Sequence, residues 1–168
     1  MTRLLVLGGA RSGKSRYAQA RAESLPGDLV YVATAQPLDA EMEDRIARHR
    51  ADRGPRWSTL DVPLDLPAAV PIQARPGRVL LVDCLTLWTS NLMFAERDLD
   101  AETEALAHAV AQAAGPVILV ANEVGLGIVP DNALARRFRD AAGRLNQAIA
   151  AAADEVQFLA AGLPLRLK

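Results

Sequence analysis

The sequence predicts one α/β domain, a P-loop nucleotide-binding fold of the RecA-like type with helices on both faces of a mostly parallel sheet. Three observations predict this fold. Short apolar runs alternate with helical segments along the chain. The runs are continuously apolar, as expected for strands that are buried on both faces. A glycine-rich loop ending in Gly-Lys-Ser separates the first run from the first helix.

Length and composition agree with a single domain spanning residues 1–168. Of the 168 residues, 51% are hydrophobic and 23% are charged, which is typical of a globular protein. The formal net charge of −1 provides no field that would attract nucleic acid or an anionic membrane. No apolar run approaches the roughly 20 residues of a membrane span. The first run is also too short for a signal peptide, so we expect a cytoplasmic protein without nucleic-acid or membrane partners.

The individual elements follow from apolar runs, helical periodicity and turn residues. We expect buried strands at residues 3–7, 29–33, 79–83, 117–121 and 156–160. We expect helices at residues 14–24, 39–53, 85–94, 100–114 and 132–153. The proline-rich residues 56–77 leave room for a short strand and a short helix, and residues 165–167 for a short last strand.

The glycine-rich loop is a full match to G-x-x-x-x-G-K-[ST], and it lies between a predicted strand and a predicted helix, as that motif requires. Its backbone N–H groups and the helix N-terminus favour bound phosphate. The lysine of the motif reaches the β- and γ-phosphates, and its last hydroxyl binds Mg²⁺. The residues concerned are Gly8, Gly9, Ala10, Arg11, Ser12, Gly13, Lys14 and Ser15.

Asp83 is the expected acidic partner of this loop. It ends the apolar run VLLVD, where the metal-binding aspartate of a P-loop enzyme would lie. The alternative is that Asp83 caps the helix that follows it. The guanine-reading motif N-K-x-D is absent, which disfavours a switch GTPase.

His49 is a candidate nucleophile, although a structural role is the simpler interpretation of the residues alone. On a helix, His49 would lie between Arg45 and Arg53. Like charge from the guanidinium groups favours the neutral, nucleophilic imidazole. The only other histidine, His108, is expected to face solvent on its helix.

Five segments together resemble the bifunctional adenosylcobinamide kinase / adenosylcobinamide-phosphate guanylyltransferase family of cobalamin biosynthesis. The resemblance covers nearly the whole chain in the same order, and its most specific part is NEVGxGIVP with the following R-x-F-R-D-x-x-G-x-x-N-Q, residues 122–147. The segments are GGARSGKSRYA, YVATAQPLDAEMEDRIARHRADRGPRW, LLVDCLTLWTSNLMF, NEVGLGIVPDNALARRFRDAAGRLNQAIAAAADEV and a G-x-P-x-x-x-K tail.

The resemblance implies two reactions. ATP or GTP first phosphorylates the aminopropanol hydroxyl of adenosylcobinamide. GTP then transfers GMP to that phosphate through a guanylylated histidine, which His49 matches here, and the product is adenosyl-GDP-cobinamide. The resemblance also implies a homotrimer with its active site near a subunit boundary, while the phosphate loop itself predicts Mg²⁺ as cofactor.

The family's functional residues match defined positions of this sequence. His49 corresponds to the guanylylated histidine, whereas the expected catalytic role of Lys14 and metal-binding roles of Ser15 and Asp83 come from the phosphate-loop motif. Some members carry glutamate where Asp61 and Asp83 stand here. Beyond Gly8 to Ser15, the implied nucleotide contacts are Thr34, Ala35, Gln36, Arg50, Ala51, Asp52, Arg53, Asp61 and Asp83.

Two other functions fit parts of the sequence. A P-loop kinase for another small metabolite would explain the loop and Asp83, with His49 structural, but would leave NEVGLGIVP unexplained. A nucleotide-sensing module without transfer chemistry would explain the loop alone.

Overall fold

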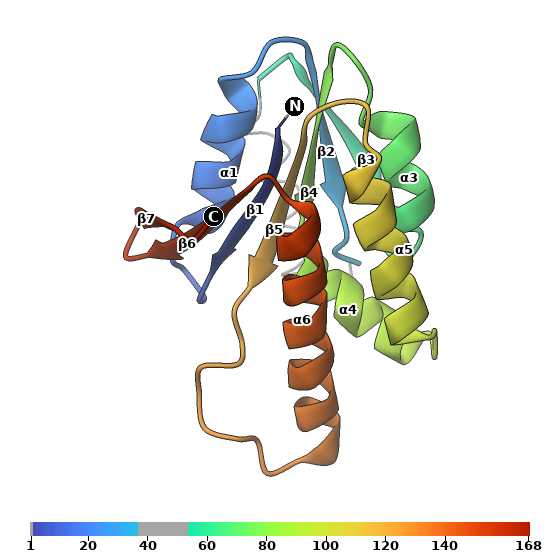
Figure 1. Ribbon diagram of the computed structural model, residues 1–168, viewed down its shortest axis with the longest axis vertical. Helices are drawn as coiled ribbons and strands as arrows, with labels where there is room; N and C mark the ends of the chain where they lie inside the picture. The colour runs from blue at the N-terminus through green and yellow to red at the C-terminus, as the bar shows by residue number, and fades with distance from the viewer. Residues whose placement is uncertain (1, 37–53) are drawn as a thin grey trace.

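The computed structural model describes residues 2–36 and 54–168 (Figure 1). The helix expected at 39–53 lies outside these residues. The same holds for five of the predicted site residues, namely His49, Arg50, Ala51, Asp52 and Arg53.

A seven-stranded sheet forms the centre of the molecule, in the order β3-β2-β4-β5-β1-β6-β7. All neighbouring strands run parallel except β7, which runs antiparallel to β6. The predicted mostly parallel α/β fold is therefore confirmed. The strands are β1 (Arg3–Gly8), β2 (Asp28–Ala33), β3 (Trp57–Asp61), β4 (Arg78–Asp83), β5 (Val117–Asn122), β6 (Glu155–Ala160) and β7 (Leu163–Arg166).

Helices cover both faces of this sheet, as the sequence predicts (Figure 1). Helix α1 packs on one face, where Ala18 and Ala22 join the core formed by β1, β2, β4 and β5. The other described helices pack on the opposite face, with Trp88 fully buried among them. They are α3 (Leu66–Gln73), α4 (Leu85–Phe94), α5 (Leu99–Ala111) and α6 (Ala133–Ala152), and α1 is Lys14–Glu23.

Two elements add to or differ from the sequence-based expectations. The short strand for which residues 56–77 left room is β3, an edge strand whose residues are all exposed or half-buried. Helix α5 begins at Leu99 because the Asp98 side chain accepts hydrogen bonds from the N–H groups of Asp100 and Ala101, each at 3.1 Å. It ends at Ala111, earlier than the expected residue 114.

The helices of the described residues include none long and apolar enough to span a bilayer.

Candidate phosphate-binding site

The predicted site residues converge because parallel strands end at one edge of the sheet, the lower edge in Figure 1. In the strand register, Gly8 of β1 lies opposite Asn122 of β5. Ala33 of β2 lies between Asp61 of β3 and Asp83 of β4. In open α/β sheets, ligands bind outside the carboxyl ends of the strands, which is where this edge lies.

The loop between β1 and α1 has backbone geometry that requires its glycines. Gly13 adopts a left-handed conformation with φ of 91°, which residues with a side chain rarely adopt. At Gly8, an added Cβ would lie 2.5 Å from the Ser12 Oγ and 2.6 Å from the Leu159 carbonyl oxygen. The loop can therefore close tightly only with glycine at these two positions. The predicted strand–loop–helix arrangement is confirmed.

The turn between β6 and β7 supports this loop from the side, a contact that the sequence analysis missed. Ala161 and Gly162 form the turn with φ of 51° and 81°, as in the two-residue turns that suit hairpins. The N–H of Gly162 donates to the Ser12 carbonyl oxygen at 2.9 Å. A Cβ on Gly13 would lie 3.2 Å from the Gly162 Cα. The loop is thus fixed to the C-terminal hairpin as well as to its own helix.

Lys14 is the buried cation of the loop. Its Nζ donates to the Gly9 carbonyl oxygen at 2.9 Å, so the side chain curls back over the loop. Burial lowers the pKa of Lys14 below its ordinary value, and the nearby charge of Asp83 acts in the opposite direction. A bound triphosphate would favour the charged lysine, because the phosphate oxygens replace the water that burial removes.

Asp83 lies at the end of β4, close enough to Lys14 to influence its pKa. The capping alternative is wrong, because Cys84 is the N-cap residue of α4 and no side chain caps that helix. The neighbouring backbone is held by Thr34, whose Oγ1 donates to the Cys84 carbonyl oxygen at 2.7 Å and accepts from its N–H at 2.9 Å. Burial also raises the pKa of the Cys84 thiol, so Cys84 remains a neutral thiol.

Ser15 and Asp83 both offer oxygen ligands at this edge. Ser15 lies exposed in the first turn of α1, and Asp83 is half-buried. Hydroxyl and carboxylate oxygens are the ligands that Mg²⁺ prefers, and two protein ligands leave positions for phosphate and water. The donor set therefore fits Mg²⁺. Within residues 2–36 and 54–168, no group of three or more His, Cys, Asp or Glu side chains forms a separate metal site.

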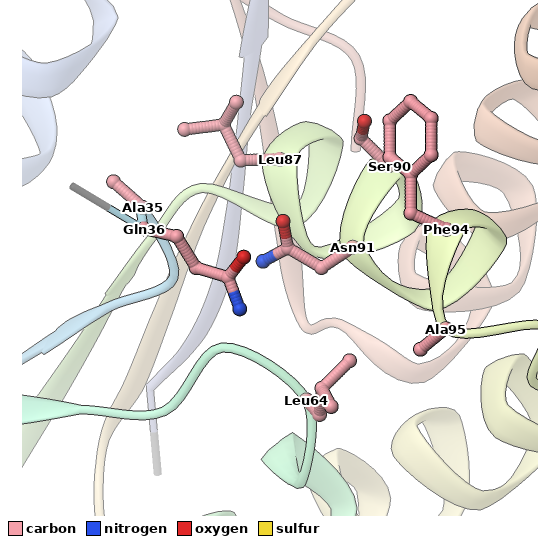
Figure 2. A pocket seen from close by; sticks show the side chains of 8 residues that line it. All are labelled: Ala35, Gln36, Leu64, Leu87, Ser90, Asn91, Phe94 and Ala95. Carbon is pink, nitrogen blue, oxygen red and sulfur yellow. The ribbon is translucent and has the colours of Figure 1, made fainter. Parts of the chain in front are cut away.

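Ala35 and Gln36 line a pocket of about 320 Å³ beyond the end of β2 (Figure 2). Asn91 of α4 forms part of its wall and donates from Nδ2 to the carbonyl oxygens of Thr34 at 2.8 Å and Pro63 at 3.0 Å. Figure 2 shows the amides of Gln36 and Asn91 on facing sides of this space. None of the described residues that line it is charged; the others are Leu64, Leu87, Ser90, Phe94 and Ala95.

Asp61 stands farther from the loop than the other predicted residues. It ends the edge strand β3 and is exposed to solvent. In the sheet order, three strands (β2, β4 and β5) lie between β3 and the loop-bearing strand β1. Its proposed contact with nucleotide remains a prediction.

Comparison with known proteins decides which class of P-loop enzyme this is. The family described as cobinamide kinase / cobinamide phosphate guanyltransferase matches residues 4–167. The chain belongs to this family. Its predicted assignment to the kinase and guanylyltransferase family is thereby confirmed, and the chain is a transferase of that family.

Three relatives are similar over almost their full length. The chain is 51% identical over 166 residues to the bifunctional adenosylcobalamin biosynthesis protein CobP of Pseudomonas aeruginosa, covering 98% of this chain and 96% of that protein. It is 42% identical over 180 residues to the bifunctional adenosylcobalamin biosynthesis protein CobU of Salmonella typhimurium. It is 41% identical over 183 residues to the protein of the same name from Escherichia coli. The last two matches each cover 98% of this chain and 99% of the relative.

Two residues that the sequence analysis quoted but assigned no role, Asn122 and Glu123, also reach the site. The Asn122 N–H donates to Thr86 Oγ1 of α4 at 2.7 Å. The Glu123 N–H donates to the Gly8 carbonyl oxygen at 3.0 Å, directly beside the phosphate loop. The NEVG segment, which begins at the last residue of β5, was the sequence signal for these positions.

Proposed function

We propose that this member of the family phosphorylates adenosylcobinamide with ATP or GTP and then transfers GMP from GTP to adenosylcobinamide phosphate. The product is adenosyl-GDP-cobinamide. The observation that carries the proposal is a complete phosphate loop with a buried Lys14, in a chain that matches a kinase and guanyltransferase family over residues 4–167. Both reactions use a triphosphate, and this loop has the chemistry to hold one.

The kinase step depends mainly on positioning and charge neutralisation. The loop amides of Gly8 to Ser15 would surround the phosphates, and Lys14 would leave the Gly9 carbonyl to reach them. The α1 N-terminus adds a favourable dipole. Mg²⁺, held by Ser15 and Asp83, would supply further positive charge at the phosphates when bound. Thr34, Ala35, Gln36 and Asp61 are proposed to contact the rest of the nucleotide.

The guanylyl transfer is proposed to proceed through His49. A neutral imidazole attacks the α-phosphorus of GTP, and pyrophosphate leaves toward Lys14. The resulting guanylyl-histidine then donates GMP to the phosphate of the acceptor. Arg50, Ala51, Asp52 and Arg53, which follow His49 in the sequence, are proposed to hold the nucleotide during this step.

A labelling experiment tests the histidine step. GTP radiolabelled at the α-phosphate should leave GMP on the protein, and the bond should be stable to base and labile to acid. We expect His49→Ala to abolish the label. His108→Ala is the matched control, because His108 is exposed on α5 and should label normally. If His49→Ala and His108→Ala both retain the label, His49 is not the nucleophile.

A product assay separates this function from a kinase for another metabolite. Adenosylcobinamide incubated with ATP and GTP should give first its phosphate and then its GDP-linked form. If neither product forms while GTP still binds, another acceptor or a purely sensing role is indicated.

A cytoplasmic homotrimer is also proposed. Large apolar side chains lie exposed in the segment after β5 and in the C-terminal hairpin, including Leu126, Ile128, Leu163 and Leu165. Exposed apolar groups of this kind are typical of protein interfaces. Light scattering should give three times the 18.0 kDa chain mass, and a mass equal to one chain would contradict the trimer.

A further inference from the structure

The segment that follows β5 begins with Glu123, a carboxylate to which the proposed function assigns no role. We infer that Glu123 is the general base of the kinase step, taking the proton from the acceptor hydroxyl. The inference rests on the proposed function, because it needs an alcohol acceptor and a triphosphate in the loop.

Backbone contacts place Glu123 beside the phosphate loop. β5 is the immediate neighbour of β1, and Asn122 pairs with Gly8 at the end of the two strands. Glu123 is the next residue, and its N–H donates to the Gly8 carbonyl oxygen at 3.0 Å. Neighbouring strands are about 4.8 Å apart. The backbone of Glu123 therefore lies about one inter-strand distance from Gly8, where the phosphate loop begins.

The Glu123 side chain is held in one orientation and retains a free oxygen. Its Oε1 accepts from the Gly125 N–H at 2.6 Å. Position 125 suits glycine, because a Cβ there would lie 2.8 Å from that oxygen. In the described part of the chain, Oε2 has no hydrogen-bond partner and the carboxylate forms no ion pair. The side chain is half-buried, so an acceptor can reach it.

The other carboxylates at this edge are less suited to the role. Asp83 lies near Lys14 and is the proposed metal ligand. Asp61 is on the outer strand β3, beyond β5, β4 and β2 as counted from β1. Among the described carboxylates that end a strand or directly follow one at this side of the sheet, only Glu123 comes from a strand adjacent to β1.

The proton balance explains why only one of the two reactions needs this base. In the kinase step the acceptor O–H bond breaks and its proton passes to Glu123 Oε2. The oxygen forms a bond to the γ-phosphorus, and the bond from that phosphorus to the β–γ bridging oxygen breaks. The electron pair leaves with the nucleoside diphosphate, whose charge Lys14 and the loop amides neutralise. In the transferase step the acceptor is a phosphate monoester, which is already largely ionised near pH 7.

The two reactions can therefore be compared in one variant. Glu123→Gln keeps the size of the side chain and removes its basicity. Given adenosylcobinamide and ATP, we expect kcat of the kinase step to fall by about 10²- to 10⁴-fold, with little change in KM for ATP. Given adenosylcobinamide phosphate and GTP, we expect guanylyl transfer to be retained. Glu104→Gln, at an exposed position of α5, is the matched control and should retain both reactions.

A conservative variant provides the second measurement. Glu123→Asp keeps a carboxylate at this position and should retain part of the kinase kcat that Glu123→Gln loses. The inference is overturned if Glu123→Gln keeps kinase kcat within tenfold of wild type. It is also overturned if both reactions fall together, since that result indicates a structural role for the loop. If the wild-type protein performs neither reaction, the proposed function itself fails instead.

Discussion

The Arg21–Glu155 ion pair joins the helix that follows the phosphate loop to the strand beside β1. Arg21 Nη1 and Nη2 donate to Glu155 Oε1 and Oε2 at 2.7 and 2.8 Å, a two-point contact between α1 and β6. These hydrogen bonds lower the pKa of Glu155 from 4.5 to about 2. We predict that Glu155→Gln destabilises the protein near neutral pH and that this effect disappears in acid.

The expected magnitude follows from the displaced pKa and from the exposure of the pair. Fully realised, the lowering of the pKa of Glu155 corresponds to roughly 3 kcal/mol. The Arg21 and Glu155 side chains are 31% and 23% exposed, so solvent screening reduces the contribution to about 1–2 kcal/mol. Because the folded-state pKa is the lower one, the stabilisation is complete above about pH 5 and is lost as the pH falls toward 2.

Urea unfolding at several pH values between 7 and 2.5 measures this difference. The free energy of unfolding of wild type should exceed that of Glu155→Gln by about 1–2 kcal/mol at pH 7, and the gap should close through the acidic range. Glu104→Gln, which alters an exposed position of α5, should show no comparable gap. A gap that stays constant from pH 7 to pH 2.5 would refute the assignment of the stabilisation to the Glu155 charge.

Two further substitutions probe buried cationic groups. Lys14→Met should lower GTP affinity by about tenfold or more, measured by calorimetry. It should change the free energy of unfolding by less than about 1 kcal/mol, because within the described residues Lys14 Nζ donates only to the neutral Gly9 carbonyl oxygen. A larger loss of stability would contradict this expectation. Arg139→Met should leave the free energy of unfolding unchanged or raise it by up to about 1 kcal/mol, because Arg139 Nη1 is buried and has no hydrogen-bond partner among residues 2–36 and 54–168. A clear destabilisation of Arg139→Met in urea would show that the guanidinium is satisfied in solution.

Local sequence rules predicted most of the fold because the buried strands and their turns carry strong signals. Residues 79–82 and 117–121 are apolar throughout and are followed by the polar residues Asp83 and Asn122, and β4 and β5 occupy nearly the same positions. The long α6 also begins where its cap predicts, since Asn132 Oδ1 accepts from the Ala135 N–H at 2.9 Å. Periodicity alone could not show that β3 is an edge strand, because the position of a strand in a sheet depends on the connections between elements.

The phosphate loop was predicted, whereas its supports were not, and the reason is their separation along the chain. Gly162 contacts Ser12 and Gly13 only because β6 pairs with β1. A turn of alanine and glycine near the C-terminus carries no local sign of that contact. The same holds for Glu123, which reaches Gly8 because β5 pairs with the other side of β1. The chemical roles of the loop residues could thus be predicted from the motif. The residues that contact the loop could be identified only once the order of the strands was known.

One phosphate loop can serve two reactions because both leaving groups carry the same kind of charge. A nucleoside diphosphate leaves in the kinase step and pyrophosphate leaves in the guanylyl transfer, and Lys14 can neutralise either. In the mechanism we propose, the two reactions differ in their first nucleophile. It is a hydroxyl that must lose a proton in the kinase step and the imidazole of His49 in the guanylyl transfer. Lys14→Met should therefore impair both reactions, Glu123→Gln only the first and His49→Ala only the second. A kinase that catalyses only phosphorylation would not show these separate losses of the two reactions. The three variants together therefore distinguish a bifunctional site from a kinase in which His49 has a structural role.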